Sequence, residues 1–428
     1  MNTRFCTHRL DNGLRVVIES MPAVKTVAAG FLCRTGARDE PGELAGVSHF
    51  LEHLCFKGTP NRDARTINLD FDRIGGQHNA FTSQDRTFYY SAARSRDAVR
   101  QIDILADMMR SIIPPDEFET EKKVVLEEIA MSGDRIESVA FDAVLENVFA
   151  GHTLGWPVLG YDRTLEPMTR DEVLDYHHRR YVPANMTLVV AGGVETQQVL
   201  QAAGRYCGTW DNVPTDDRRC APVVRTGSVS IARERFNQQM LAINFAAPSA
   251  VDPLHETALT VAAILGGANS RFHWNIEQAG ISPHAGAYRL DYGDCGLLIL
   301  MAQCDPDNAQ ELHDALRAEA RKLMTGPIDD AEIQRVKNKR RTALAVEGES
   351  PYHRLVQVMD DVDYRGAPRT VEDRLAAVQA VNHESINRYF EQYPIDGDGF
   401  LVSVGPREFP GGGWGESTVT PQPSHPVA

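Results

Sequence analysis

Three residues of one short segment have the side chains and the spacing to hold a metal ion and move a proton. His49, Glu52 and His53 stand in the order His-Phe-Leu-Glu-His. On a helix the two histidines lie ~40° apart and Glu52 lies ~60° from His49, so all three project from one face. Two neutral imidazoles four residues apart can hold one divalent ion, and a carboxylate beside them can take a proton from water. Taken alone, the segment also fits two surface histidines on an amphipathic helix.

A third ligand is expected from a second helix that carries acidic residues, because catalytic zinc sites have three protein ligands. Residues 117–131 follow Pro114-Pro115 and contain no helix breaker, which predicts a helix. Glu121 and Glu128 lie about two turns apart on it and share a face, whereas Glu127 points elsewhere. In isolation, an exposed acidic helix would explain the same glutamates.

The motif and its surroundings together resemble the pitrilysin/insulinase family of zinc metallopeptidases, in particular its mitochondrial-processing-peptidase-like branch. Glu128 follows the His-Phe-Leu-Glu-His motif after 74 intervening residues, a spacing typical of that family. Further matching segments cover most of the chain: 38–41, 46–48, 56–59, 75–83, 155–160 and 181–186.

This resemblance implies a role for each residue of the motif. His49, His53 and Glu128 would bind one Zn²⁺ per chain. Zinc lowers the pKa of bound water to about 7, and Glu52 would activate that water and relay its proton to the leaving amine during peptide hydrolysis. Glu121 would accept a hydrogen bond from a ligating imidazole and fix its tautomer.

The resemblance also implies a binding strand for the substrate. Asn79, Ala80 and Phe81 match the family's exposed edge strand, to which an extended peptide adds through main-chain hydrogen bonds. The alternative for Asn79 is a turn residue after Gly75-Gly76. His78 would point to the opposite face of the strand from Asn79, so we do not expect it to be a ligand. In the family, two two-domain halves, on one chain or two, close into a chamber around the peptide.

The elements that must position these residues predict an α+β fold. Asn12-Gly13 marks a hairpin turn, and residues 27–33, 87–90 and 187–191 have the composition of strands separated by helical stretches. A similar order of strand, helix and strand pair recurs from residue 240 onward, which predicts an internally duplicated unit. A coincidence of common α+β ordering would give the same pattern. The resemblance implies that each half is a mostly antiparallel sheet with helices packed on it.

A polar segment without periodicity, residues 208–227, carries Pro214 and Pro222 and is typical of a connector. We therefore expect a zinc-bearing catalytic α+β domain at residues 1–215 and a second, homologous α+β domain without a metal motif at residues 226–404. The Gly- and Pro-rich residues 405–428 are expected to form a disordered tail.

The second half departs from the family where its members carry an Arg and a Tyr that stabilise the developing oxyanion. Ile276 and Pro283 stand at those positions. Loss of one such donor typically costs about 10²–10³ in rate. Three interpretations stay open. A metal-free relative could supply the pair in a heterodimer, a homodimer could use Arg271 or Tyr288 instead, or the chain could be a non-catalytic structural subunit of a processing complex. The intact motif weighs against the last.

Composition limits the partners and the location. The 428 residues are 42% hydrophobic and 24% charged, as in ordinary globular proteins of two or more domains. The excess of 59 acidic over 44 basic residues, 44 − 59 = −15, disfavours nucleic acid and anionic membranes as partners. No apolar run reaches the ~18 residues of a membrane span, and the N-terminus lacks a secretory pattern. Seven cysteines without a Cys-x-x-Cys pair favour a reducing compartment, so we expect a cytoplasmic protein. The resemblance implies that its substrate is a peptide.

Overall fold

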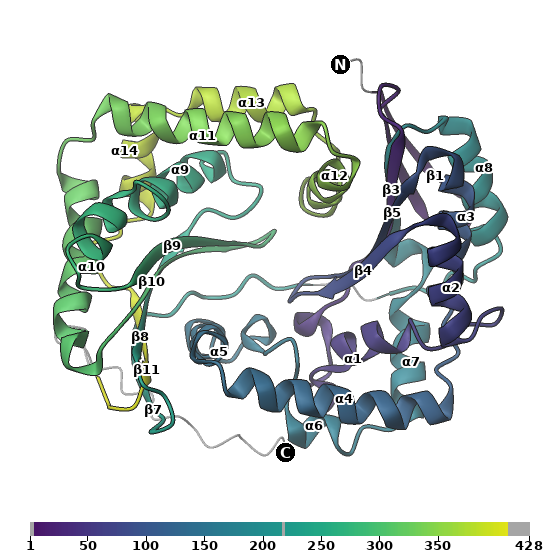
Figure 1. Ribbon diagram of the computed structural model, residues 1–428, viewed down its shortest axis with the longest axis horizontal. Helices are drawn as coiled ribbons and strands as arrows, with labels where there is room; N and C mark the ends of the chain where they lie inside the picture. Colours follow the sequence, from purple (N-terminus) through teal and green to yellow (C-terminus); the bar gives the residue numbers. More distant parts are fainter. Residues whose placement is uncertain (1–3, 216–218, 410–428) are drawn as a thin grey trace. The chain divides into compact units, whose positions relative to one another are not determined.

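The computed structural model describes residues 4–215 and 219–409, which form two compact units (Figure 1). Unit 1 comprises the described residues within Met1–Ala130, Trp156–Arg219 and Ala345–Thr370; unit 2 comprises those within Met131–Gly155, Cys220–Leu344 and Val371–Ala428. The boundaries 1–215 and 226–404 inferred from the sequence stay a prediction. Most of the predicted tail, from residue 410 onward, lies outside the described residues.

Unit 1 contains a six-stranded sheet in the order β1-β2-β6-β3-β5-β4. Its strands are β1 (Arg4–Arg9), β2 (Arg15–Ser20), β3 (Thr26–Cys33), β4 (Gln77–Thr82), β5 (Thr87–Arg94) and β6 (Met186–Gly192). All neighbours are antiparallel except β2 and β6, which are parallel. The turn at Asn12-Gly13 joins β1 to β2, and Gly13 has the positive φ of 98° that such a turn requires.

Helices cover both faces of this sheet. They are α1 (Val47–Leu54), α2 (Ala64–Ile74), α3 (Ala98–Met108), α4 (Pro115–Gly133) up to Ala130, α6 (Asp162–Leu165), α7 (Arg170–Arg180), α8 (Thr196–Cys207) and α12 (Pro351–Arg365). Val16 and Ile18 of β2 belong to the core beneath α1, α3 and α8, whereas Val17 packs with α12 on the other face. This alternation is the period of two of a strand. Because both faces are covered, β2 is apolar on both sides.

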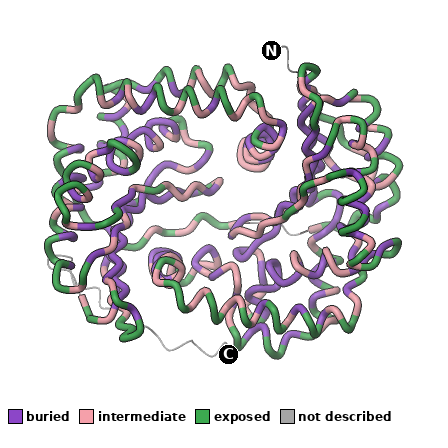
Figure 2. Tube along the Cα trace, viewed as in Figure 1, coloured by how far each residue is buried: buried purple, intermediate pink, exposed green. Residues whose placement is uncertain are grey.

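Unit 2 contains a five-stranded sheet in the order β7-β11-β8-β10-β9. Its strands are β7 (Gly227–Ala232), β8 (Gln239–Ala247), β9 (His284–Asp291), β10 (Gly296–Cys304) and β11 (Phe400–Gly405). Its helices are α5 (Ile136–Val148), α9 (His255–Leu265), α10 (Ala309–Thr325), α11 (Asp330–Gly348) up to Leu344, α13 (Val371–Ala380) and α14 (His383–Gln392). One face of the sheet packs with α5, and the other packs with α9, α10 and α14. Figure 2 shows the buried strands and the exposed outer sides of the helices.

The two sheets have the same connectivity, which confirms the predicted α+β fold built from a duplicated unit. In each, a parallel pair (β2 and β6, or β7 and β11) is followed by three antiparallel neighbours. The helices α5 and α12 are equivalent elements of the two units, but each belongs to the unit that is formed mainly by the other half of the sequence. The helix α5, from the first half, belongs to unit 2, and α12, from the second half, belongs to unit 1.

A buried ion pair fastens α12 to the sheet of unit 1. Arg354 Nε lies 2.8 Å from Glu19 Oε2, and both side chains are almost fully buried. Leu355, Val358 and Met359 pack beside the pair against the strands. Among the described helices of the chain, none combines the length and the apolar composition that a bilayer span requires.

Candidate active site

The histidine-bearing helix α1 begins at a glycine that the local packing requires. Gly46 has a φ of 97°, and a Cβ atom there would lie 2.7 Å from the carbonyl oxygen of Leu159. The Glu40 carboxyl group accepts hydrogen bonds from the backbone N–H groups of Gly46 and Ser48, each at 2.7 Å. These bonds satisfy two of the first N–H groups of the helix. The start of α1, and with it the direction of its histidines, is therefore fixed.

The structure brings His49 and His53 of α1 together with Glu128 of α4. Glu128 Oε2 lies 3.7 Å from His49 Nε2 and 3.6 Å from His53 Nε2. In the part of the chain that the structure describes, these three residues form the one group of His, Cys, Asp or Glu side chains close enough to share a metal ion. Ligand atoms of a tetrahedral zinc ion are about 3.3–3.6 Å apart, given bond lengths of about 2.0–2.2 Å. The donor set thus fits zinc, and its ligand atoms, which all lie within 4.8 Å of one another, are spread somewhat wider than around a bound ion.

The second ring nitrogen of each histidine has a different environment. His53 Nδ1 lies 3.2 Å from Glu121 Oε2, and Glu121 Oε1 lies 2.6 Å from the Lys57 ammonium group. This arrangement favours a proton on His53 Nδ1 and leaves Nε2 free as a metal donor. His49 Nδ1 is buried and has no hydrogen-bond partner within the described residues. Burial, with a smaller contribution from His53, lowers the pKa of His49 to about 3, so its imidazole is neutral at pH 7.

Glu52 projects from α1 toward the edge strand of the sheet. Its Oε2 accepts a hydrogen bond of 2.5 Å from Thr82 Oγ1, at the end of β4. Burial raises the pKa of Glu52, and the Thr82 hydrogen bond opposes that shift. A carboxylate whose pKa is raised toward neutrality is better suited to accept a proton than an exposed one.

The residues predicted to bind substrate lie on an edge strand. Among the described strands, β4 pairs with β5 alone, and it packs beside α1 (Figure 1). Asn79 is within this strand, and its Oδ1 accepts a hydrogen bond from the backbone N–H of Ala80. Phe81 packs toward α12, whereas His78 stacks on Phe71 of α2 with 4.0 Å between ring centroids. His78 therefore lies on the opposite face from Phe81 and outside the metal group.

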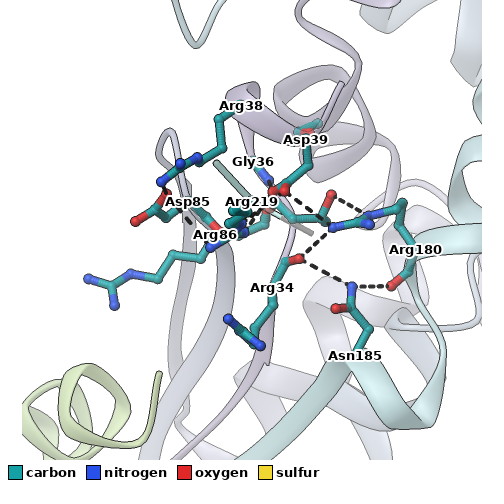
Figure 3. A network of polar contacts seen from close by, with 12 residues as sticks. Arg34, Gly36, Arg38, Asp39, Asp85, Arg86, Arg180, Asn185 and Arg219 are labelled. Atoms are coloured by element: carbon teal, nitrogen blue, oxygen red, sulfur yellow. Dashed lines mark hydrogen bonds and ion pairs between the residues drawn. The ribbon is translucent and has the colours of Figure 1, made fainter. Parts of the chain in front are cut away.

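A polar network holds the turn that follows β4 (Figure 3). Arg38 Nη1 donates to Asp85 Oδ1 at 2.9 Å, and Arg219 donates to both carboxylate oxygens of Asp39 at 2.9 and 2.7 Å. A Cβ atom on Gly36 would lie 2.2 Å from the carbonyl oxygen of Ser83 in the turn. The segment 36–39 thus packs tightly against the turn between β4 and β5.

Sequence reasoning missed two residues that contact the site, Thr82 and Lys57. Thr82 falls on the same face of β4 as His78 and Ala80, because side chains alternate along a strand. That period, together with the expected position of the histidine helix, could have indicated it. Lys57 follows His53 by four residues but lies beyond the end of α1 at Leu54. Helical periodicity therefore gave no reliable signal for its contact with Glu121.

Comparisons with known proteins identify the family. The model of the insulinase domain (peptidase family M16) matches residues 15–162, and that of the peptidase M16 inactive domain matches residues 167–340. The chain belongs to peptidase family M16. This M16 peptidase is 32% identical over 348 residues to an uncharacterized zinc protease of Rickettsia felis, with 80% of this chain and 84% of the relative covered. It is 30% identical over 383 residues to the uncharacterized zinc protease YmxG of Bacillus subtilis, with 88% and 92% covered.

Solved structures share the fold. A protease from Helicobacter pylori matches with a TM-score of 0.89 at 21% identity, covering 94% of this chain and 100% of that one. A chain of complex III2 from Candida albicans matches with a TM-score of 0.83 at 15% identity, covering 94% and 96%. The zinc-protease relatives, together with the His-His-Glu group, make this M16 peptidase a zinc-dependent metallopeptidase.

The second half of the M16 peptidase has neither Arg nor Tyr at the two positions, 276 and 283, where the family's oxyanion donors were expected from the sequence. Ile276 is fully buried in the core of unit 2, and neither it nor Pro283 has a polar side chain. Arg271 donates through Nε and Nη2 to both carboxylate oxygens of Glu332, at 2.9 and 2.8 Å. Tyr288 of β9 is 45% exposed. Of the two substitutes considered from the sequence, Arg271 is thus already paired, whereas Tyr288 is accessible.

Proposed function

We propose that this M16 peptidase is the metal-bearing catalytic subunit of an assembly that cleaves extended peptides in a closed chamber. A family-related, metal-free subunit supplies the Arg and Tyr that this chain lacks. The observation that carries the proposal is the convergence, within unit 1, of His49, His53 and Glu128 with a partly buried carboxylate, Glu52, and an edge strand.

The zinc ligands of the proposal are His49 and His53 through Nε2 and Glu128 through a carboxylate oxygen, with one ion per chain. When bound, zinc supplies Lewis acidity that polarises a carbonyl group and makes water nucleophilic at neutral pH. Glu121 orients the His53 ring through Nδ1, and Lys57 holds Glu121. The low pKa of His49 keeps its imidazole in the neutral form that binds metal.

Glu52 is the general base of the proposal. Its Oε2 is engaged by Thr82, so its Oε1 accepts the proton of the attacking water. The raised pKa lets the carboxyl group hold that proton until it is delivered to the leaving amine. Glu52 thus acts first as the general base and then as the general acid of peptide hydrolysis.

The substrate is held by β4. An extended peptide pairs with the outer edge of the strand at Asn79, Ala80 and Phe81, and main-chain hydrogen bonds provide the affinity. Such pairing tolerates many side chains, so selection among peptides falls to side-chain pockets and to the size of the chamber.

We propose a heterodimer because this chain lacks the Arg and Tyr side chains that would donate hydrogen bonds to the oxyanion. The side chains of Ile276 and Pro283 donate no hydrogen bond, and Arg271 is occupied by Glu332. One observation favours a second arrangement, a self-sufficient homodimer. The Tyr288 hydroxyl lies 3.1 Å from His284 Nε2 on the exposed edge strand β9, where it could donate to a substrate carbonyl.

The proposed location is the cytoplasm. Five cysteines of the described residues are free thiols: Cys6, Cys33, Cys55, Cys207 and Cys304. A reducing compartment maintains that state.

The test compares the purified chain with and without a metal-free relative that carries the Arg and Tyr pair. Zinc content and hydrolysis of a mixed peptide library are measured for the wild-type chain and for Glu52→Gln. The proposal expects one zinc per chain, weak or no cleavage by the chain alone, and strong cleavage after the relative is added. Glu52→Gln should abolish that cleavage and retain zinc.

Other results discriminate among the alternatives. Full activity of the isolated wild-type chain, reduced by Tyr288→Phe, would replace the heterodimer with the homodimer. A chain that binds no zinc, or a Glu52→Gln variant with wild-type activity, would overturn the proposed active site.

A further inference from the structure

We infer that Thr82 is a positioning residue that orients the Glu52 carboxylate; the inference rests on the proposed function, in which Glu52 is the base. Thr82 is the last residue of β4, and its Oγ1 donates to Glu52 Oε2 at 2.5 Å. A hydrogen bond from a hydroxyl to a carboxylate is among the stronger hydrogen bonds in proteins. It restricts rotation of the carboxylate and leaves Oε1 as the oxygen that faces the reaction.

The surroundings of Thr82 direct its hydroxyl hydrogen to Glu52. The other nearby hydroxyl group is that of Thr87, whose Oγ1 lies 3.4 Å from Thr82 Oγ1. Thr87 Oγ1 itself donates to the carbonyl oxygen of Thr35 at 3.0 Å. A threonine hydroxyl has a single hydrogen, and an ionised carboxylate only accepts. The Glu52 carboxylate is thus the closest acceptor for the Thr82 hydrogen.

The backbone of Thr82 is held in place from both sides. Thr82 pairs with Thr87 in the antiparallel ladder, and the Ser83 N–H donates to the Arg86 carbonyl oxygen at 2.8 Å. The Ala37 N–H donates to the Ser83 carbonyl oxygen at 3.2 Å, within the segment that the network of Figure 3 anchors. A donor on a rigid element positions its acceptor more precisely than a donor on a free loop.

The contact links the base to the strand proposed to bind the peptide. Thr82 faces α1, and Asn79 and Phe81 face the other way along β4. One strand therefore sets both the register of the peptide and the orientation of the base. Loss of the Thr82 hydroxyl should lower kcat and leave KM unchanged, because peptide pairing uses the main chain.

The kinetic test is made on the active assembly and uses Thr82→Val, which preserves the shape of the side chain, and Thr82→Ser, which keeps the hydroxyl. Ser83→Ala is the matched control, because Ser83 Oγ donates to the Arg86 carbonyl oxygen in the same turn and has no contact with Glu52. We expect Thr82→Val to lower kcat about 10–100-fold with unchanged KM and zinc content. Thr82→Ser should recover most of the loss. Wild-type kcat in Thr82→Val, or an equal loss in Ser83→Ala, would overturn the inference.

A second readout needs no activity. Melting temperatures of the zinc-free chain are compared for the wild type, Thr82→Val, Glu52→Leu and the double variant. If the hydrogen bond forms, the two shifts are not additive, because each single variant already removes the same contact. Additive shifts would overturn the inference. Wild-type activity of Glu52→Gln would instead overturn the proposed function. If the shifts in melting temperature were non-additive in that case, the hydrogen bond would exist but would not serve catalysis.

Discussion

Units 1 and 2 bring equivalent helices together with different residues at the contact. In unit 1, α1 follows β3 and meets α4 through His49, His53 and Glu128. In unit 2, α9 follows β8, and its Glu256 Oε2 lies 3.5 Å from Arg340 Nη2 of α11. The described part of unit 2 contains no cluster that could hold a metal. In both units the fold brings two equivalent helices into contact. The residue types at that contact determine whether it can bind a metal or forms an ion pair.

The largest expected effect comes from removing a ligand from the contact in unit 1. Glu128→Gln takes away the anionic oxygen that faces both imidazoles, so we expect loss of zinc and loss of peptidase activity. Glu127→Gln is the matched control, because Glu127 is an exposed neighbour on the same helix. Zinc content and peptide hydrolysis are measured on both. Equal zinc loss in both variants would contradict the assignment of Glu128 as the zinc ligand that distinguishes unit 1 from unit 2.

The second effect separates chemistry from metal binding. Glu52→Gln keeps the size of the side chain and removes the base, and loss of a general base typically costs about 10²–10⁴ in rate. We expect kcat to fall by that factor in the active assembly while zinc content stays at the wild-type value. Zinc loss comparable to that of Glu128→Gln would instead assign Glu52 to the metal.

The third effect concerns Lys57 and Glu121, which hold the His53 ring in its orientation. Lys57→Met removes the ammonium group 2.6 Å from Glu121, so that, among the described residues, His53 remains as the partner of that carboxylate. Changes behind a metal ligand typically weaken metal binding about 10–100-fold, and we expect the lower part of that range. Competition with a zinc chelator measures the affinity. Lys123→Met, at an exposed position of α4, should leave it unchanged.

The smallest effect tests the ion pair of unit 2. Arg340→Met leaves Glu256 without its partner, and the Arg340 side chain is one-third exposed. We expect the free energy of unfolding to fall by about 1 kcal/mol, with zinc content unchanged. Denaturant unfolding measures the first and metal analysis the second. Loss of zinc from this variant would contradict the account, because the ion pair belongs to unit 2 and the metal ligands belong to unit 1.

The sequence predicted the local features of the site well. The spacing of His49 and His53 indicates a shared face because helical geometry is local, and Asn12-Gly13 indicates a hairpin for the same reason. The residues alone offered the helix of Glu121 and Glu128 as one possible source of the third ligand, with an exposed acidic helix as the alternative. The choice of Glu128 rested on the resemblance, because nothing local specifies which acidic side chain approaches the histidines. The contacts of Thr82 with Glu52 and of Lys57 with Glu121 join elements far apart in sequence. Strand alternation places Thr82 on one face of β4, but no local pattern specifies that Glu52 lies opposite that face.

The exchange of α5 and α12 was also beyond local patterns. Both helices have apolar positions that must be buried, but their sequences do not specify which sheet buries them. The full burial of Arg354 against Glu19 is a case in point, because an arginine in an amphipathic helix is normally assigned to the exposed face. Its partner is 335 residues away in the sequence.

The most direct test of the metal centre is anomalous diffraction at the zinc edge from crystals of the zinc-loaded chain. We predict one peak per chain, about 2.0–2.2 Å from Nε2 of His49, Nε2 of His53 and a carboxylate oxygen of Glu128. A peak bound by other residues, or zinc bound while these three side chains point apart, would contradict the proposed site.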